Sequence, residues 1–180
     1  GYWANLYHYD EDAESLNYET SSEIKEAGTA SLRMTHASQY AIIIDKQSHE
    51  LPFTDLGEGQ WYESAVRYVY LNGIMQGMSD TIFQPNGTLS RAMAVQILYN
   101  LEGQPDISDE NLGYPYSDVD ADSWYGNAVY WARITGVATG YGDNTFHPTA
   151  SITRQEFAQI LCNYADYKGY DLSAQGAFST

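Results

Sequence analysis

A chain of 180 residues, of which 43% are hydrophobic and 14% aromatic, has enough apolar side chains for one or two small folded domains, which argues against disorder. Its 24 acidic and 8 basic residues give a net charge of −16, which disfavours nucleic acid and anionic membranes as general partners. The single cysteine excludes an internal disulfide, and no apolar run is long enough to cross a membrane. Because no signal peptide opens the sequence, we expect any export signal to lie upstream.

The first part of the chain, residues 1–46, has the composition and alternation of β-strands. Short segments with this pattern lie at residues 2–9, 16–18, 29–35 and 40–44. About four short antiparallel strands are too few to form a stable hydrophobic core on their own. We therefore expect the C-terminal part of a β-sandwich-like domain, or a small β module that packs on the next part of the chain. Residues 45–51 are polar and form the expected linker to the rest.

Two later segments are copies of one another. Residues 115–164 superimpose on residues 52–101 without a gap when 63 is subtracted from their numbers. The pairs that match include Asp55 with Asp118, Trp61 with Trp124, Gly77 with Gly140, and Arg91 with Arg154. Such self-similarity indicates a tandem repeat whose units bury their faces against each other.

Each copy predicts two amphipathic helices joined by a loop. The first helix begins near Trp61 or Trp124 and stops at a glycine, Gly73 or Gly136. A Phe-x-Pro segment in the loop between the helices is expected to place an apolar side chain under the turn. The second helix has apolar residues at i, i+3, i+4 and i+7, the spacing of a buried helix face.

These elements predict an α+β fold, with an N-terminal antiparallel β module followed by two tandem helix-loop-helix repeats packed as a helical bundle. The boundaries that we expect are 1–46 for the β module, 52–103 and 115–168 for the two repeats, and 169–180 for a linker toward a third repeat. A two-helix unit cannot bury its faces alone, so the copies should pack on one another.

The start of each second helix combines a hydroxyl residue with an arginine, as Ser90-Arg91 and Thr153-Arg154. The first turn of a helix has unpaired backbone N–H groups, and a guanidinium can grip a carboxylate with two parallel hydrogen bonds. The pattern therefore predicts a small anion-binding site at each helix start. Simple N-capping by the two hydroxyl residues is compatible with that role.

Other repeated residues have two interpretations each. Trp61 and Trp124 would stack on a sugar or anchor the core. Gly77 and Gly140 would let the backbone approach a sugar or supply a positive φ in a turn. The two arginines would bind a ligand, or each would form an ion pair with a carboxylate such as Asp55 or Asp118.

The repeated residues resemble S-layer homology modules. The motifs that carry the resemblance, each with a counterpart in the second copy, are Phe53-x-Asp55, Trp61-Tyr62, Gly73-Ile74, Gly77, Phe83-x-Pro85 and Leu89-Ser90-Arg91. The resemblance implies modules that usually occur in threes as a pseudo-threefold bundle. It also implies attachment of a secreted protein to the secondary cell-wall polymer of a Gram-positive-type envelope, often through a terminal pyruvylated N-acetylmannosamine.

One departure from the family pattern concerns the helix start of the first copy. The family's Thr-Arg-Ala-Glu pattern forms a capping box, which Thr153 and Glu156 keep, whereas the first copy has Met93 in place of the glutamate. We expect the helix start in the first copy to be less firmly fixed, by a few tenths to about 1 kcal/mol.

The sequence thus predicts a non-catalytic anchoring module, located outside the cell in the wall or S-layer, that binds secondary cell-wall polysaccharide. The expected ligand-binding residues are Arg91, Arg154, Ser90, Thr153, Trp61, Trp124, Asp55, Asp118, Gly77 and Gly140. The alternative is a structural spacer or an oligomerisation module without glycan binding, which would form a homo-oligomer or pair with a third module.

Enzymatic and metal-dependent functions have little support in the sequence. No Ser-His-Asp order, glycine-rich phosphate loop or HExxH motif occurs. Asp118-x-Asp120-x-Asp122 resembles the opening of a calcium loop but lacks the glycine and the glutamate that complete one. We therefore expect no catalytic residue, cofactor or metal.

Overall fold

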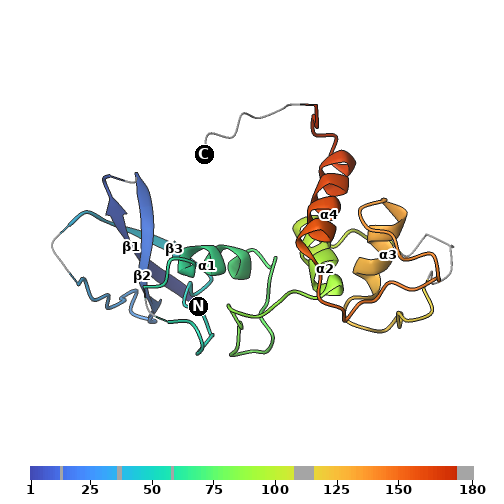
Figure 1. Ribbon diagram of the computed structural model, residues 1–180. Helices are drawn as coiled ribbons and strands as arrows, with labels where there is room; N and C mark the ends of the chain where they lie inside the picture. The colour runs from blue at the N-terminus through green and yellow to red at the C-terminus, as the bar shows by residue number, and fades with distance from the viewer. Residues whose placement is uncertain (13, 36–37, 58, 108–115, 174–180) are drawn as a thin grey trace. The chain divides into compact units, whose positions relative to one another are not determined.

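The computed structural model describes residues 1–12, 14–35, 38–57, 59–107 and 116–173, and it contains three strands followed by four helices (Figure 1). The chain divides into two compact units, residues 1–85 and 86–180. The division falls between the two helices of the first repeat.

The first unit begins with an antiparallel sheet of three strands, β1 (Tyr2–Asp10), β2 (Ser15–Ile24) and β3 (Tyr40–Asp45), in the order β2-β1-β3. This confirms an N-terminal antiparallel β module. The strand expected at residues 29–35 is wrong, because this segment is irregular. The sheet order explains the difference: β2 and β3 lie on opposite sides of β1, so the chain between them must cross the sheet instead of pairing within it.

Helix α1 (Glu63–Leu71) completes the first unit. It buries Val66, and the turn after it buries Ile74. The helix ends at its C-cap Asn72, and Gly73 follows with a φ of +69°, as the glycine stop signal predicts. Asn72 and Gly73 donate their backbone N–H groups to the carbonyl oxygens of Tyr68 and Tyr70, which satisfies the last turn.

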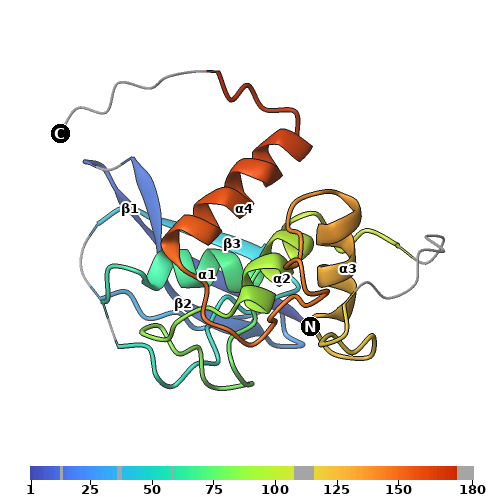
Figure 2. The same ribbon diagram turned by 45° about the vertical axis from the view of Figure 1, so that its right-hand side comes forward.

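The second unit contains α2 (Arg91–Leu101), α3 (Gly126–Ile134) and α4 (Arg154–Tyr167). Helices α2 and α3 pack side by side (Figure 2), so the second helix of the first repeat packs on the second repeat, as expected for tandem copies. The core joins all three helices and the loop after α3; its members include Val95, Leu98, Val129, Trp131, Val137, Phe146 and Ile160. Phe146, from the Phe-x-Pro segment, is fully buried, which confirms its expected place under the turn.

Candidate functional site

The two repeated aspartates shape the loops between the helices. Asp55 accepts backbone hydrogen bonds from Phe83 at 2.9 Å and Gln84 at 2.7 Å. Asp118 accepts the equivalent bonds from the aligned residues of the second copy, both at 2.8 Å. The bond from Phe83 is the main cause that lowers the pKa of Asp55. Within the described residues neither aspartate pairs with an arginine, so this form of the ion-pair alternative is wrong.

Each of the two repeated glycines leaves space for an aromatic ring to pack against the loop backbone. A Cβ atom on Gly77, whose φ is +82°, would lie 2.7 Å from the Phe53 ring. A Cβ atom on Gly140 would collide with the ring of Tyr116, whose hydroxyl accepts the Gly140 N–H at 2.7 Å. Both glycines are therefore required by packing within the chain, and any contact with a sugar would be additional.

The hydroxyl residues before α2 and α4 are N-caps, as predicted. Ser90 Oγ accepts the Met93 N–H at 3.2 Å, and Thr153 Oγ1 accepts the Glu156 N–H at 3.3 Å. The return bond differs between them. Thr153 N donates to the Glu156 carboxylate at 2.9 Å, whereas Ser90 N meets the Met93 sulfur at 3.4 Å. A thioether is a weak acceptor, so the cap in the first copy is closed by a weaker bond.

The first N–H groups of α2 are already used inside the protein. Arg91 N and Ala92 N each donate at 2.9 Å to loop carbonyl oxygens, those of Ala150 and Pro148. In α4, by contrast, the described part of the chain offers no acceptor for Arg154 N or Gln155 N. The sequence predicted unpaired N–H groups at both helix starts, and this holds at α4 but is wrong at α2, because the loop of the second copy lies against the start of α2.

The side chain of Arg91 is buried, with 9% of the residue exposed. Its Nη2 donates to the Thr139 carbonyl oxygen at 2.7 Å, and the guanidinium carbon lies 4.9 Å from the centre of the Phe146 ring. Glu156 Oε1 is 3.9 Å from Nη1, and the Arg91 Nε atom is buried without a partner among the described residues. Arg91 thus connects the start of α2 to the loop and the helix of the second copy.

Arg154 has the opposite surroundings, because it is exposed and no ion pair is formed by it within the described ranges. Beside it, the Glu156 carboxylate accepts from Thr153 N, from Thr153 Oγ1 at 2.7 Å and from the Tyr141 hydroxyl at 2.8 Å. These hydrogen bonds lower the pKa of Glu156 to about 2. The cap is therefore ionised and fixed, and Arg154 projects from a rigid helix start.

The repeated tryptophans are on the surface. Trp61 is 89% exposed and Trp124 is 61% exposed, so the alternative that they anchor the core is wrong. Each ring lies edge-on against the tyrosine that follows it. The buried tryptophan is Trp131, on α3, with 1% exposed. Large exposed aromatic faces of this kind are suited to stacking on sugar rings.

Tyr141 was not among the predicted site residues, although its ring lies 5.2 Å from the Arg91 guanidinium and its hydroxyl binds Glu156. It aligns with Met78 in the first copy, so no repeat signal marks it. Hydrogen bonding to Glu156 is the main cause that raises the pKa of Tyr141. The hydroxyl therefore remains a donor at neutral pH.

The acidic run after Asp118 serves the local turn, where Asp120 accepts the Asp122 N–H at 3.0 Å. Across the residues with a described position, no three His, Cys, Asp or Glu side chains gather as metal ligands would.

None of the described helices combines the length and the apolar character that crossing a bilayer requires.

These observations describe one class of protein, a tandem helix-loop-helix module. Each copy has a loop aspartate bound to the loop backbone, a capped second helix and an exposed tryptophan, and Arg154 is exposed in the second copy. Residues 52–94 and 115–158 each match the S-layer homology domain, and these two segments are S-layer homology modules. Modules of this family anchor cell-surface proteins to the cell wall and are not themselves catalytic. The chain therefore belongs to the extracellular wall or S-layer of a Gram-positive-type envelope.

Similar proteins are surface proteins and large hydrolases. An amylopullulanase of Thermoanaerobacterium thermosulfurigenes is 30% identical over 155 residues, which are 86% of this chain and 8% of that protein. The surface-layer 125 kDa protein of Lysinibacillus sphaericus is 33% identical over 66% of this chain and 10% of its own length. The S-layer protein of Bacillus licheniformis is 27% identical over 71% of this chain and 14% of its length. The chain thus spans only a small fraction of each relative.

Proposed function

We propose that this chain anchors its parent protein by binding a carboxylate of secondary cell-wall polysaccharide, such as the pyruvate ketal of N-acetylmannosamine, at the start of α4. The observation that carries the proposal is the exposed Arg154 beside two backbone N–H groups, Arg154 N and Gln155 N, that have no acceptor in the described structure. A guanidinium and a helix N-terminus both favour a carboxylate. The net charge of −16 gives the chain no general attraction for anions. Binding of a carboxylate therefore depends on the local arrangement of the guanidinium and the N–H groups.

In this proposal the predicted site residues divide into two groups. In the second unit, Arg154 contacts the charged group, Thr153 caps the helix start that carries Arg154, and Trp124 offers a stacking surface for a sugar ring. In the first unit, Trp61 offers a separate stacking surface. The other residues hold loops and helix starts within their own units: Asp55 and Gly77 in the first unit, and Arg91, Ser90, Asp118 and Gly140 in the second. Any activity of the parent protein, including hydrolysis, would belong to other parts of that protein.

Calorimetry with purified wall polymer, before and after removal of its pyruvate, tests the proposal. We expect binding that requires pyruvate and weakens at least about tenfold in Arg154→Ala, because a charge-assisted hydrogen bond is lost. Arg154→Lys should retain part of the affinity, since it keeps the charge without the two-pronged geometry. Binding that is unchanged in Arg154→Ala, or that is independent of pyruvate, would contradict the proposal.

A second candidate function, a structural or oligomerisation module, is favoured by the exposed face of α4. Leu161 is 43% exposed and Cys162 is exposed, whereas the aligned residues of α2, Leu98 and Tyr99, are buried. Because Cys162 aligns with Tyr99, the sequence predicts a packing role for it, and its exposure contradicts that prediction. Self-association through this face predicts a mass that rises with concentration, measurable by analytical ultracentrifugation, and loss of that rise in Leu161→Glu. A constant monomer mass would exclude it.

A further inference from the structure

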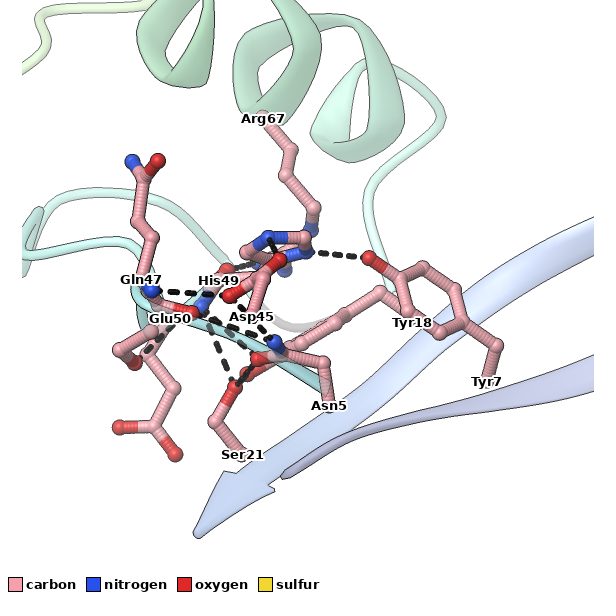
Figure 3. Close-up of polar contacts among 10 residues, drawn as sticks. Asn5, Tyr7, Tyr18, Ser21, Asp45, Gln47, His49, Glu50 and Arg67 are labelled. Atoms are coloured by element: carbon pink, nitrogen blue, oxygen red, sulfur yellow. Dashed lines mark hydrogen bonds and ion pairs between the residues drawn. The ribbon is translucent and has the colours of Figure 1, made fainter. Parts of the chain in front are cut away.

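A polar network in the first unit fixes the segment that follows β3 (Figure 3). Asn5 is fully buried, and its Nδ2 donates to the Gln47 carbonyl oxygen at 3.1 Å and to Asp45 Oδ1 at 3.2 Å. The Gln47 N–H donates to the same Asp45 oxygen at 2.8 Å. Both ends of the Gln47 backbone unit are therefore held, and its position is determined by the sheet.

The same segment is also fixed to α1. Arg67 donates from Nη1 to the His49 carbonyl oxygen, and its guanidinium lies 3.8 Å from the centre of the Tyr18 ring. A salt bridge of 3.1 Å to Glu63 orients the guanidinium further. The polar segment 45–51, expected from the sequence to be a linker, is thus a tightly held connection between the sheet and α1.

This connection forms one wall of a cleft of about 300 Å³ within the first unit. The cleft is lined by Gln47, Tyr70, Gly73, Gln76 and Asp80. Figure 3 shows the Gln47 side chain directed away from the polar network. Within the described residues, the side chains of Gln47, Gln76 and Asp80 take part in no hydrogen bond or ion pair. Two glutamines and an aspartate thus line this cleft, and the described residues leave the hydrogen-bonding capacity of their side chains unused.

The second copy shows how the same aspartate is satisfied when a hydroxyl residue follows it. Asp143, the counterpart of Asp80, accepts hydrogen bonds from the backbone and the hydroxyl of Thr145, at 3.2 and 2.5 Å. In the first copy Ile82 occupies the position of Thr145 and has no hydroxyl to donate. The departure from the repeat therefore leaves the Asp80 carboxylate free to accept hydrogen bonds from another molecule.

We propose that this cleft is a second glycan subsite, which binds an uncharged sugar residue within the wall polymer; the proposal rests on the proposed function. Carboxylate and amide groups hydrogen-bond sugar hydroxyls, and the Tyr70 ring adds an aromatic surface. None of the described residues that line the cleft is a cation, and Asp80 would repel a carboxylate, so we expect the pyruvate-bearing residue to be excluded from it. The volume is at the lower end for small-molecule pockets, which suits one sugar ring.

The test is a titration of the ¹⁵N-labelled chain with N-acetylmannosamine and with N-acetylglucosamine, followed by NMR. We expect saturable shifts of the Gln47, Gly73, Gln76 and Asp80 amide signals with a dissociation constant of about 1 mM. Asp80→Ala should weaken this binding about tenfold or more, whereas the matched Asp143→Ala in the second copy should leave it unchanged. The spectra themselves show whether each variant is folded.

Two results would overturn the subsite: no shifts at these amides with either sugar, or equal shifts in wild type and in Asp80→Ala. Arg154→Ala separates this inference from the proposed function. It should abolish pyruvate-dependent polymer binding and leave the neutral-sugar shifts intact. Pyruvate-dependent binding without neutral-sugar shifts would refute the subsite alone, and the reverse result would refute the proposed function alone.

Discussion

The two helix starts that carry the repeated arginine have the same local sequence pattern and opposite surroundings. At α2 the loop of the second copy covers Arg91 and takes up the N–H groups of the first turn. At α4 the described residues leave Arg154 exposed and two such groups without an acceptor. A repeated motif in a tandem array thus specifies a helix start, while the neighbouring segments decide whether the arginine at that start is buried or exposed.

The two loop phenylalanines should differ most strongly in how much they stabilise the fold. Phe146 is fully buried, whereas its counterpart Phe83 is only partly buried. Phe146→Ala should lower the free energy of unfolding of the second unit by about 3–5 kcal/mol, because it removes a buried ring and leaves a cavity. Phe83→Ala should cost clearly less. Urea unfolding of the full chain measures both, and equal losses would show that the two loops are packed alike.

The two arginines should differ next most strongly. Arg91→Ala loses a charge-assisted hydrogen bond to Thr139 and two aromatic contacts, so we expect a loss of about 2–3 kcal/mol of stability. Arg154→Ala changes an exposed side chain and should stay within about 0.5 kcal/mol. Thermal unfolding of both variants measures the two stability losses. A stability loss in Arg154→Ala as large as that in Arg91→Ala would contradict the assignment of the two residues to different roles.

The caps should respond differently to acid. Hydrogen bonds from Thr153 and Tyr141 lower the pKa of Glu156 to about 2, below its value in the unfolded chain. Ionised Glu156 therefore stabilises the fold above its unfolded pKa, and this contribution is lost as the pH falls from about 4.5 towards 2. Because α2 has Met93 at this position, it has no equivalent contribution.

Melting temperatures between neutral and acidic pH measure this difference. Glu156→Gln should flatten the acidic limb of the wild-type profile, because the side chain no longer titrates. Glu26→Gln, at an exposed glutamate in the turn after β2, serves as a matched control for the loss of a carboxyl group, and it should not flatten that limb. An acidic limb that is the same in Glu156→Gln as in wild type would contradict the role of this carboxylate.

The smallest effect concerns the weaker cap. Met93→Glu places a carboxylate where the Ser90 N–H now meets a sulfur atom, so it should stabilise α2 by a few tenths to about 1 kcal/mol. The reverse change, Glu156→Met, should destabilise α4 by a similar amount at neutral pH. Unfolding in urea resolves differences of this size when the slopes are equal. Destabilisation by Met93→Glu would mean that the thioether is needed for packing.

Much of the fold could be predicted from local patterns. The helix stops before Gly73 and Gly136 and the caps at Ser90 and Thr153 follow from residues within a few positions of each other. The repeat and the family follow from comparing such short motifs between the two copies. The irregular segment 29–35 could not be predicted, because its alternation suits a strand and only the sheet order β2-β1-β3 assigns it to the crossover.

For the candidate site, the sequence was sufficient to identify the equivalent residues of the two copies, because similar local motifs fold into similar turns and caps. The burial of Arg91 and the exposure of Arg154 and Trp61 are known only from the three-dimensional packing. The hydrogen bonds of Asp143 to Thr145 also come from the structure, whereas the Ile82 that replaces Thr145 in the first copy is visible in the sequence. The physical reason is that burial and free hydrogen-bonding capacity depend on which segments pack together. The residues of a shared motif do not indicate which segments pack against each copy.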